Sequence, residues 1–326
     1  MKRQLAVLIL VAASACGGSK PAPSSSSGLT IAVIPKGTSH TFWQSIHAGA
    51  NRAGTELGAE IIWRGPLRED DRDSQVSEVE GFVSRGVSGI ALAPLDESAL
   101  TGPVADAAAK KIPVVIFDSG LKGGDYVSFV ATDNLKGGEL GGERLVEAMH
   151  GKGKAILLRY AEGHDSTTKR EEGFLEALKR HTGVEIVSSN QYVGTDVEIA
   201  YKKAESILNT YKRPDGSLGI DGIFCVNESS SFAVMRVLQD NGWAGKVHFV
   251  GFDSSENLVK ALEDRTLDGL VIQDPVRMGY LAVKTLVAHI KGEPVEKRID
   301  TGVQVITPDN MNQPEMKALL HPDLAK

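Results

Sequence analysis

Residues 113–118 of this 326-residue chain read Pro-Val-Val-Ile-Phe-Asp, a short apolar run that ends in a carboxylate. A run this short, rich in β-branched residues, predicts a strand buried on both faces rather than a helix. Residues 89–93 form a second such run, and apolar residues at helical spacing lie between the two: Leu100, Val104, Ala107 and Ala108. A strand, a helix and a strand in this order predict parallel pairing within an α/β fold.

The same rhythm extends in both directions and then restarts. Further strands are predicted at residues 31–34, 60–63 and 127–130, and a second series follows the crossover expected near residues 131–134. That second series has strands at 155–158, 184–187, 222–226 and 247–250, again separated by amphipathic helices. Two consecutive series predict two similar domains, each a doubly wound parallel sheet with helices on both faces.

The C-terminal part adds strands at 267–272 and 303–306 and a helix at 276–290, too few elements to bury a core of their own. We expect them to complete the two existing sheets, so that the chain crosses three times between domains. The expected N-terminal lobe comprises residues 29–132 and 274–297, and the expected C-terminal lobe comprises 133–273 and 298–326. A three-crossing hinge predicts two lobes that close around a ligand.

The N-terminus reads as an export signal over residues 1–15, because Lys2 and Arg3 precede an apolar run that ends in small residues before Cys16. The Ala-Ser-Ala-Cys ending resembles a bacterial lipobox, which implies that Cys16 carries a lipid; the alternative is a plain secretory signal with an incidental Cys. Residues 16–28, rich in Ser, Gly and Pro, predict a flexible tether. We therefore expect a protein of the periplasm or cell envelope, held to the membrane by its lipid alone. Cys225 then has no disulfide partner and is expected in the core.

Several function classes find no support in the residues. The net charge is −6 without a basic run, which argues against nucleic acid. The eight His residues lack metal-ligand spacing, and no Gly-x-Ser-x-Gly nucleophile motif occurs. The glycines of residues 136–142 and 151–154 match no phosphate-binding loop and are interpreted as helix-start and turn glycines. We expect no metal, no cofactor and no enzymatic activity, with a hydrolase or epimerase on the same fold as the alternative.

A series of motifs indicates a family. In chain order they are residues 31–35 with 40–43, 113–118, 132–138, 170–174, 226–228, 250–253 and 271–273. Together they resemble the ribose-type periplasmic binding proteins, over about residues 29–308. The same fold forms the sensor half of sugar-responsive repressors, but those begin with a DNA-binding helix-turn-helix, whereas this chain begins with the predicted export signal.

The resemblance implies a function. The implied protein is a monomeric substrate-binding protein of an ABC importer. Its two lobes close around a pentose or hexose, and it delivers this sugar to a permease driven by an ATPase. The alternatives are a receptor for signalling or chemotaxis, and a polyol, inositol or other small molecule as the ligand.

Four polar residues directly follow predicted strands: Asp118, Asn227, Asp253 and Gln273. Ligands of open α/β sheets bind beyond the carboxyl ends of the strands, so we expect these side chains to hydrogen-bond sugar hydroxyls. For Asp118, Asn227 and Asp253 the alternative is a helix N-cap.

Nearer the N-terminus, the resemblance implies that Phe42 and Trp43 stack on the sugar and that His40 is a polar ligand-binding residue. Aromatic faces suit the C–H faces of a sugar, although an aromatic residue at a helix start can also be core. Ser166 and Thr167 are further candidate donors.

The sequence also departs from the ribose-binding pattern. Ser119 and Thr168, which the resemblance places among the ligand-binding residues, stand where that family has two pocket Arg residues. The Asn after the third strand is replaced near Ala93. These changes argue against ribose itself. The loop of residues 63–72 either supplies a replacement Arg or is a solvated charged turn.

Overall fold

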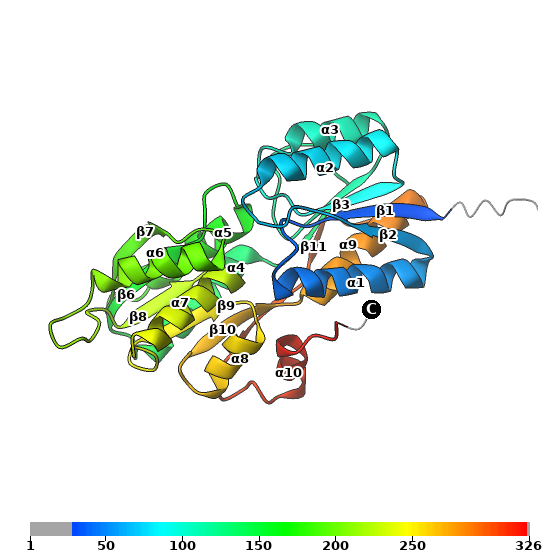
Figure 1. The fold of residues 1–326 in the computed structure, drawn as a ribbon. Helices are drawn as coiled ribbons and strands as arrows, with labels where there is room; N and C mark the ends of the chain where they lie inside the picture. Colours follow the sequence, from blue (N-terminus) through cyan, green and yellow to red (C-terminus); the bar gives the residue numbers. More distant parts are fainter. Residues whose placement is uncertain (1–27, 325–326) are drawn as a thin grey trace, which may run out of the picture.

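The computed structural model describes residues 28–324, which form two lobes, each a parallel-type sheet covered by helices on both faces (Figure 1). This arrangement confirms the predicted pair of doubly wound domains. The C-terminal lobe repeats the layer structure of the N-terminal lobe, so the two sheets present equivalent strand ends to the space between them.

The first lobe contains β1 (Leu29–Ile34), α1 (Thr41–Leu57), β2 (Ala59–Trp63), α2 (Arg72–Arg85), β3 (Gly89–Leu92), α3 (Thr101–Ala109), β4 (Val114–Phe117), β5 (Ser128–Ala131), α9 (Pro275–Ile290) and β11 (Arg298–Asp300). Its strand order is β11-β5-β4-β3-β1-β2. The run at 113–117 is apolar throughout because both faces of β4 are buried. Val115 and Phe117 pack under α1 and α9, whereas Val114 and Ile116 pack under α2 and α3.

The second lobe contains α4 (Asn134–Ala148), β6 (Gly153–Arg159), α5 (Asp165–Lys179), β7 (Val184–Tyr192), α6 (Val197–Asn209), β8 (Gly222–Cys225), α7 (Glu228–Asp240), β9 (His248–Phe252), α8 (Glu256–Glu263), β10 (Gly269–Gln273), β12 (Val303–Ile306) and α10 (Pro314–Leu320). The strand order is β12-β10-β9-β8-β6-β7. Only β12 runs antiparallel to its neighbour among the described strands. Helices α4 and α5 cover one face of this sheet, and α6, α7, α8 and α10 cover the other.

Three short segments connect the lobes: residues 132–133, residue 274 and residues 301–302. The first and third lie side by side, since the hydroxyls of Thr132 and Thr301 are 3.2 Å apart and Arg298 Nη2 donates to the Thr132 carbonyl oxygen at 3.0 Å. The expected boundary at residue 298 was wrong, because β11 pairs with β5 in the first sheet. This three-residue strand has one apolar residue, Ile299, so it left no apolar run to detect.

Glycines allow the close approach of one helix pair in each lobe. A Cβ on Gly138 of α4 would lie 2.0 Å from the carbonyl oxygen of Arg170 in α5, and one on Gly173 would lie 2.0 Å from that of Leu135. In the first lobe, a Cβ on Gly49 of α1 would lie 1.9 Å from the Val276 oxygen of α9. The interpretation of residues 136–142 as helix-start glycines was therefore wrong, because Gly138 is a packing position inside α4.

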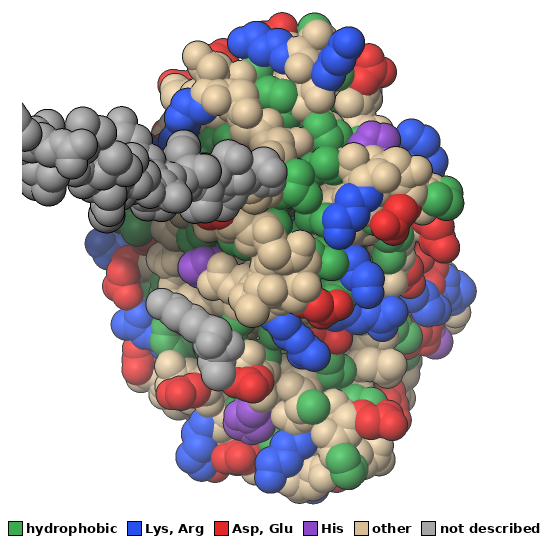
Figure 2. Space-filling model, turned by 90° about the vertical axis from the view of Figure 1, so that its right-hand side faces the viewer, with side chains coloured by type: hydrophobic (Ala, Val, Ile, Leu, Met, Phe, Trp, Pro, Cys, Tyr) green, Lys and Arg blue, Asp and Glu red, His purple; other side chains and the backbone are tan. Residues whose placement is uncertain are grey.

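Acidic and basic side chains are interspersed on the face drawn in Figure 2. Within residues 28–324, no helix combines the length and apolarity needed to cross a bilayer. Cys225 is fully buried, as expected, and burial raises the pKa of its thiol. The predicted signal and Cys16 lie outside the described residues.

Candidate functional site

The carboxyl ends of the strands in both sheets face a cavity between the lobes. Its volume is ≈ 30 Å³, room for about two water molecules, so the lobes are closed and a larger ligand enters only when they part. The first lobe contributes Lys36, His40, Phe42, Trp43, Glu69 and Asp118, and the second contributes Tyr160, Ser166, Thr167, Arg170, Asn227, Glu228, Ser229, Asp253 and Gln273.

A larger groove, ≈ 830 Å³, lies between α1 and α10. None of the buried polar side-chain atoms without a hydrogen bond, as found among residues 28–324, lies in that groove. In contrast, the cavity between the lobes contains two of them: Gln273 Oε1, and Asp118 Oδ2, whose one partner is the Lys36 ammonium group in an ion pair. The chemistry of the smaller cavity therefore makes it the candidate site.

Asp118 and Asp253 occupy equivalent positions, directly after β4 and β9, the third strand of each sheet. Both have left-handed backbones, with φ of 61° and 65°, a conformation uncommon outside glycine. The N-cap alternative was wrong for both, because Ser255 caps α8 and the next described helix after Asp118 begins only at Asn134.

Asp118 pairs with a cation that the sequence analysis missed. Lys36, which is 3 % exposed, places Nζ 2.8 Å from Asp118 Oδ2 and donates to Ser166 Oγ of the other lobe at 3.0 Å. A buried charge requires such a partner. The signal for Lys36 was its position just beyond the carboxyl end of β1.

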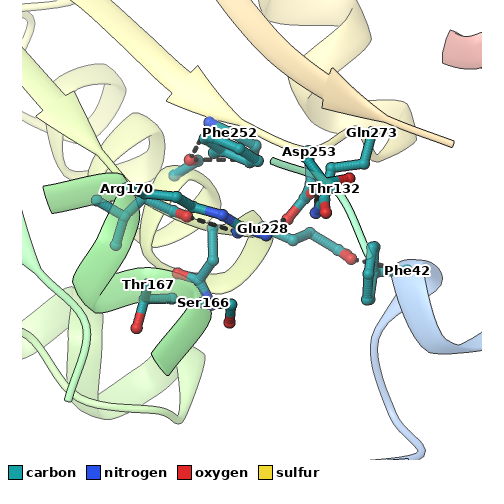
Figure 3. Close-up of polar contacts among 12 residues, drawn as sticks. Phe42, Thr132, Ser166, Thr167, Arg170, Glu228, Phe252, Asp253 and Gln273 are labelled. Atoms are coloured by element: carbon teal, nitrogen blue, oxygen red, sulfur yellow. Dashed lines mark hydrogen bonds and ion pairs between the residues drawn. The ribbon is translucent and has the colours of Figure 1, made fainter. Parts of the chain in front are cut away.

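Asp253 is held by Gln273 and faces Arg170 (Figure 3). Gln273 Nε2 donates to Asp253 Oδ1 at 2.7 Å, and Arg170 Nη1 lies 3.8 Å from Asp253 Oδ2. Burial raises the pKa of Asp253, and the nearby Arg170 opposes that rise. Gln273 Oε1 is buried without a hydrogen bond, so it offers an acceptor to a ligand.

Arg170 is fixed on every side. Its Nε donates to Asn134 Oδ1 at 2.8 Å, its Nη1 donates to the Val226 carbonyl oxygen at 2.9 Å, and its guanidinium lies 3.9 Å from the ring centre of Phe252. Asn134 in turn donates to the Asp118 carbonyl oxygen at 3.3 Å, so one hinge residue touches both halves of the site.

Glu228, the first residue of α7, reaches across to the first lobe, where Figure 3 shows its carboxyl group beside Phe42. It accepts hydrogen bonds from the backbone N–H of Phe42 at 3.0 Å and of Thr41 at 3.4 Å, at the positive end of α1. Burial raises the pKa of Glu228 to about 7, while His40 acts against the rise. Glu228 therefore joins the lobes when they are closed.

Glu69 makes a second bridge between the lobes. Its Oε1 accepts from Trp43 Nε1 at 2.8 Å, and its Oε2 accepts from the Tyr160 hydroxyl of the other lobe at 2.9 Å. His40 Nε2 lies 3.5 Å from Glu69 Oε1. The loop of residues 63–72 thus reaches this cavity with a carboxylate, and none of its Arg residues lines it. Arg64 instead pairs with Glu78 on the surface.

The remaining predicted aromatic and amide residues also line the cavity. Trp43 is 2 % exposed and belongs to the core of the first lobe as well, and the Phe42 ring meets it edge-on at 5.0 Å. Asn227 is the N-cap of α7, where its Oδ1 accepts from Ser230 N at 3.3 Å, and it also lines the cavity.

Two predicted residues, Ser119 and Thr168, do not line the cavity. Ser119 is fully buried beside it, where its Oγ accepts from Ser166 N of the other lobe at 3.1 Å. The left-handed turn at Asp118 directs the next residue toward this contact. On α5, Ser166, Thr167 and Arg170 share the buried face at helical spacing, which leaves Thr168 half-exposed.

Tyr160 and Glu69 were not predicted from the sequence, and Arg170 and Glu228 had been placed only within family motifs. Tyr160 follows β6 and Glu228 follows Asn227, so position after a strand was an available signal for both. Glu69 had none, because it lies in a loop of charged residues.

The charges of the site are largely balanced within the protein. Asp118 faces Lys36, Asp253 faces Arg170, and Glu228 binds the N-terminus of α1. Such a site suits an uncharged ligand whose hydroxyls both donate and accept hydrogen bonds. Across residues 28–324, no group of three or more His, Cys, Asp or Glu side chains is placed to hold a metal ion.

Comparisons with known proteins point to one family. The family model of the periplasmic binding protein domain matches residues 31–294. The ribose import binding protein of Haemophilus influenzae is 26 % identical over 278 residues, which cover 85 % of this chain and 91 % of that protein. The D-allose-binding periplasmic protein of Escherichia coli is 28 % identical over 264 residues, which cover 78 % and 83 %.

Solved structures agree. An ABC transporter solute-binding protein from Agrobacterium vitis with bound D-fucose is 35 % identical, with a TM-score of 0.84 over 90 % of this chain and 100 % of that one. A carbohydrate transporter solute-binding protein from Agrobacterium radiobacter in complex with D-arabinose is 32 % identical, with a TM-score of 0.84 over 91 % and 100 %.

Proposed function

Because this chain belongs to the periplasmic binding protein family, we propose that it is the substrate-binding protein of an ABC importer and binds an uncharged monosaccharide between its lobes. The observation that carries the proposal is the pair of strand-end carboxylates, Asp118 and Asp253, which face one cavity from equivalent positions with their own charge partners. The relatives are transport binding proteins for sugars rather than enzymes.

The proposed mechanism is closure on the ligand. Asp118 and Lys36 on one lobe and Asp253, Gln273 and Asn227 on the other offer acceptors and donors to ring hydroxyls, while Phe42 and Trp43 present aromatic surface. Contacts that exist only when the lobes meet, such as Lys36 to Ser166 at 3.0 Å and Tyr160 to Glu69 at 2.9 Å, add to the closed state. The ligand stabilises that state by its differential affinity for it, and the closed form then delivers the sugar to the permease.

The family indicates a periplasmic or envelope location. We further propose that residues 1–15 are an export signal, that Cys16 carries the lipid anchor, and that the protein acts as a monomer. The support for the anchor is the small-residue sequence before Cys16 and the Ser-rich tether after it. We also propose residues 132–133, 274 and 301–302 as the boundaries between the lobes.

A thermal-shift screen against pentoses, hexoses, polyols, nucleosides and amino acids tests the function, because a ligand that binds only the folded state raises its melting temperature. We expect a shift with one or a few neutral monosaccharides. Calorimetry on D118A and N227A should then show affinity at least ~100-fold weaker, as expected when buried hydrogen-bond partners are orphaned.

The matched control is D125A, because Asp125 is an exposed aspartate of the same lobe. The melting temperature of each variant without ligand separates lost binding from lost folding, which matters for N227A because it also loses a helix cap. Unchanged affinity in both site variants, or shifts with nucleosides or amino acids alone, would refute the proposal.

A further inference from the structure

A second cavity adjoins the one between the strand ends. It has a volume of ≈ 240 Å³ and is lined by Ser39, His40, Arg68, Glu69, Thr195, Asp196, Val197 and Glu198. His40 and Glu69 line both cavities, so these two side chains form the wall between them. We call the two spaces the inner and the outer cavity. The outer cavity also belongs to both lobes, because residues 195–198 come from the second lobe and the rest from the first.

The shared wall has one fixed and one adjustable side. Glu69 is held by Trp43 Nε1 at 2.8 Å and by the Tyr160 hydroxyl at 2.9 Å and is 8 % exposed. His40 has a single long contact with it, Nε2 to Oε1 at 3.5 Å. A rotation of the imidazole would therefore connect the cavities without breaking the bonds of Glu69. A substituent on a ligand in the inner cavity could then pass between His40 and Glu69 into the outer cavity.

The lining of the outer cavity is polar. It has hydroxyls on Ser39 and Thr195, carboxylates on Asp196 and Glu198 and the guanidinium of Arg68, whose Nε and Nη2 also bind the Asp70 carboxylate. Asp196 is held in place as the N-cap of α6, where its Oδ1 accepts from Glu198 N at 3.0 Å and Ile199 N at 3.1 Å. Hydrogen-bond donors and acceptors together surround this small cavity. Such a lining suits a ring with several hydroxyls and does not suit an apolar group.

We propose that the outer cavity is a second sugar subsite, so that this protein binds a disaccharide or a comparable hydroxylated glycoside. The terminal ring occupies the inner cavity, and the second ring lies between Arg68 of the first lobe and Thr195 and Asp196 of the second. The inference rests on the proposed function, since it requires a sugar in the inner cavity. It changes that function in one respect, because the monosaccharide unit in the inner cavity then carries a second ring.

Isothermal titration calorimetry tests the subsite with a panel of disaccharides, each measured beside its two monosaccharides and their methyl glycosides. We expect at least one disaccharide to bind at least ~10-fold tighter than either constituent, because a second ring adds several hydrogen bonds, each contributing about 1 kcal/mol. The methyl glycosides separate the blocked anomeric position from the second ring, and should not reach the affinity of the disaccharide.

Two variants locate the effect. R68A removes a donor from the outer cavity, and T195W fills that cavity with a larger side chain. Each should reduce the preference for the disaccharide over its monosaccharide by about tenfold. R64A is the control, because Arg64 lies on the same loop with a side chain 59 % exposed, against 56 % for Arg68, and pairs with Glu78 away from the cavity.

The outcomes are distinct. If monosaccharides bind and no disaccharide binds tighter, the subsite is refuted and the proposed function stands. A disaccharide preference that survives both R68A and T195W also refutes the subsite. If no carbohydrate of either size binds, the proposed function fails together with the inference.

Discussion

The pH dependence of ligand binding should reveal the bond that Glu228 makes across the cleft. Burial raises the pKa of this carboxyl to about 7 in the closed form, whereas in an open cleft it returns toward its ordinary value of 4.5. Closure therefore takes up a proton between these two values. The sign follows: a group with a raised pKa favours the closed form at low pH, and that advantage is lost as the pH rises through about 7.

The two pKa values bound the magnitude. A single group with these values makes ligand affinity about 30-fold stronger near pH 5.5 than near pH 8. Calorimetry at both pH values, in buffers of different ionisation enthalpy, measures the affinity and the proton uptake together. We expect close to one proton taken up at the lower pH.

E228Q removes the titrating group while an amide oxygen still accepts from the N-terminus of α1. Two other titratable groups face Glu228. Burial also raises the pKa of Asp253, so the E228Q variant keeps a dependence of the same sign from that carboxyl, whereas His40 opposes the rise in the pKa of Glu228. E256Q is the matched control, because Glu256 is likewise the first residue of a helix in this lobe but is exposed. Equal affinity of the wild type at both pH values, or an E228Q variant with the full dependence, would refute the reasoning.

Three further predictions concern the scaffold and the anchor. G138A should lower the free energy of unfolding by about 1–3 kcal/mol through overpacking against α5, whereas G81A, a helical glycine with open space around its Cβ, should raise it by up to ~1 kcal/mol; urea unfolding of both variants tests this, and equal effects would contradict it. K36M should lower the free energy of unfolding by about 3–5 kcal/mol because it leaves the Asp118 carboxylate buried without its cation. K36M/D118L should recover most of that loss in the same assay, and a double variant no more stable than K36M would contradict the reasoning. C16S should abolish labelling by a radioactive fatty acid and release the protein from the membrane fraction, and persistent labelling would show that the anchor lies elsewhere.

Much of the fold was predictable because buried parallel strands leave short apolar runs. The same runs located Asp118, Asn227, Asp253 and Gln273, since each directly follows such a run and the strand ends converge on one cavity. The alternation of strands and helices also located two of the three crossings. The third was misplaced because β11 is an edge strand of three residues with a single apolar side chain.

What remained unpredictable depends on backbone conformation and on loops. The left-handed turn at Asp118 directs Ser119 into the contact between the lobes, and no local pattern in the sequence announces such a turn. Glu69 reaches the inner cavity from a loop in which two other charged residues, Arg68 and Asp70, pair with each other. Which member of a charged loop turns inward is decided by partners distant in sequence, here Trp43 and Tyr160.

The three connections between the lobes have a mechanical consequence. Each contains only one or two residues outside regular structure, and two residues span at most about 7 Å even when fully extended. The lobes therefore have almost no freedom to slide or separate, and their relative motion reduces to a rotation about an axis through the connections. In such a rotation displacement grows with distance from the axis. A small angular change at Thr132 and Thr301 becomes a large change in spacing at the far rims, which is the quantity that a partner touching both rims would detect.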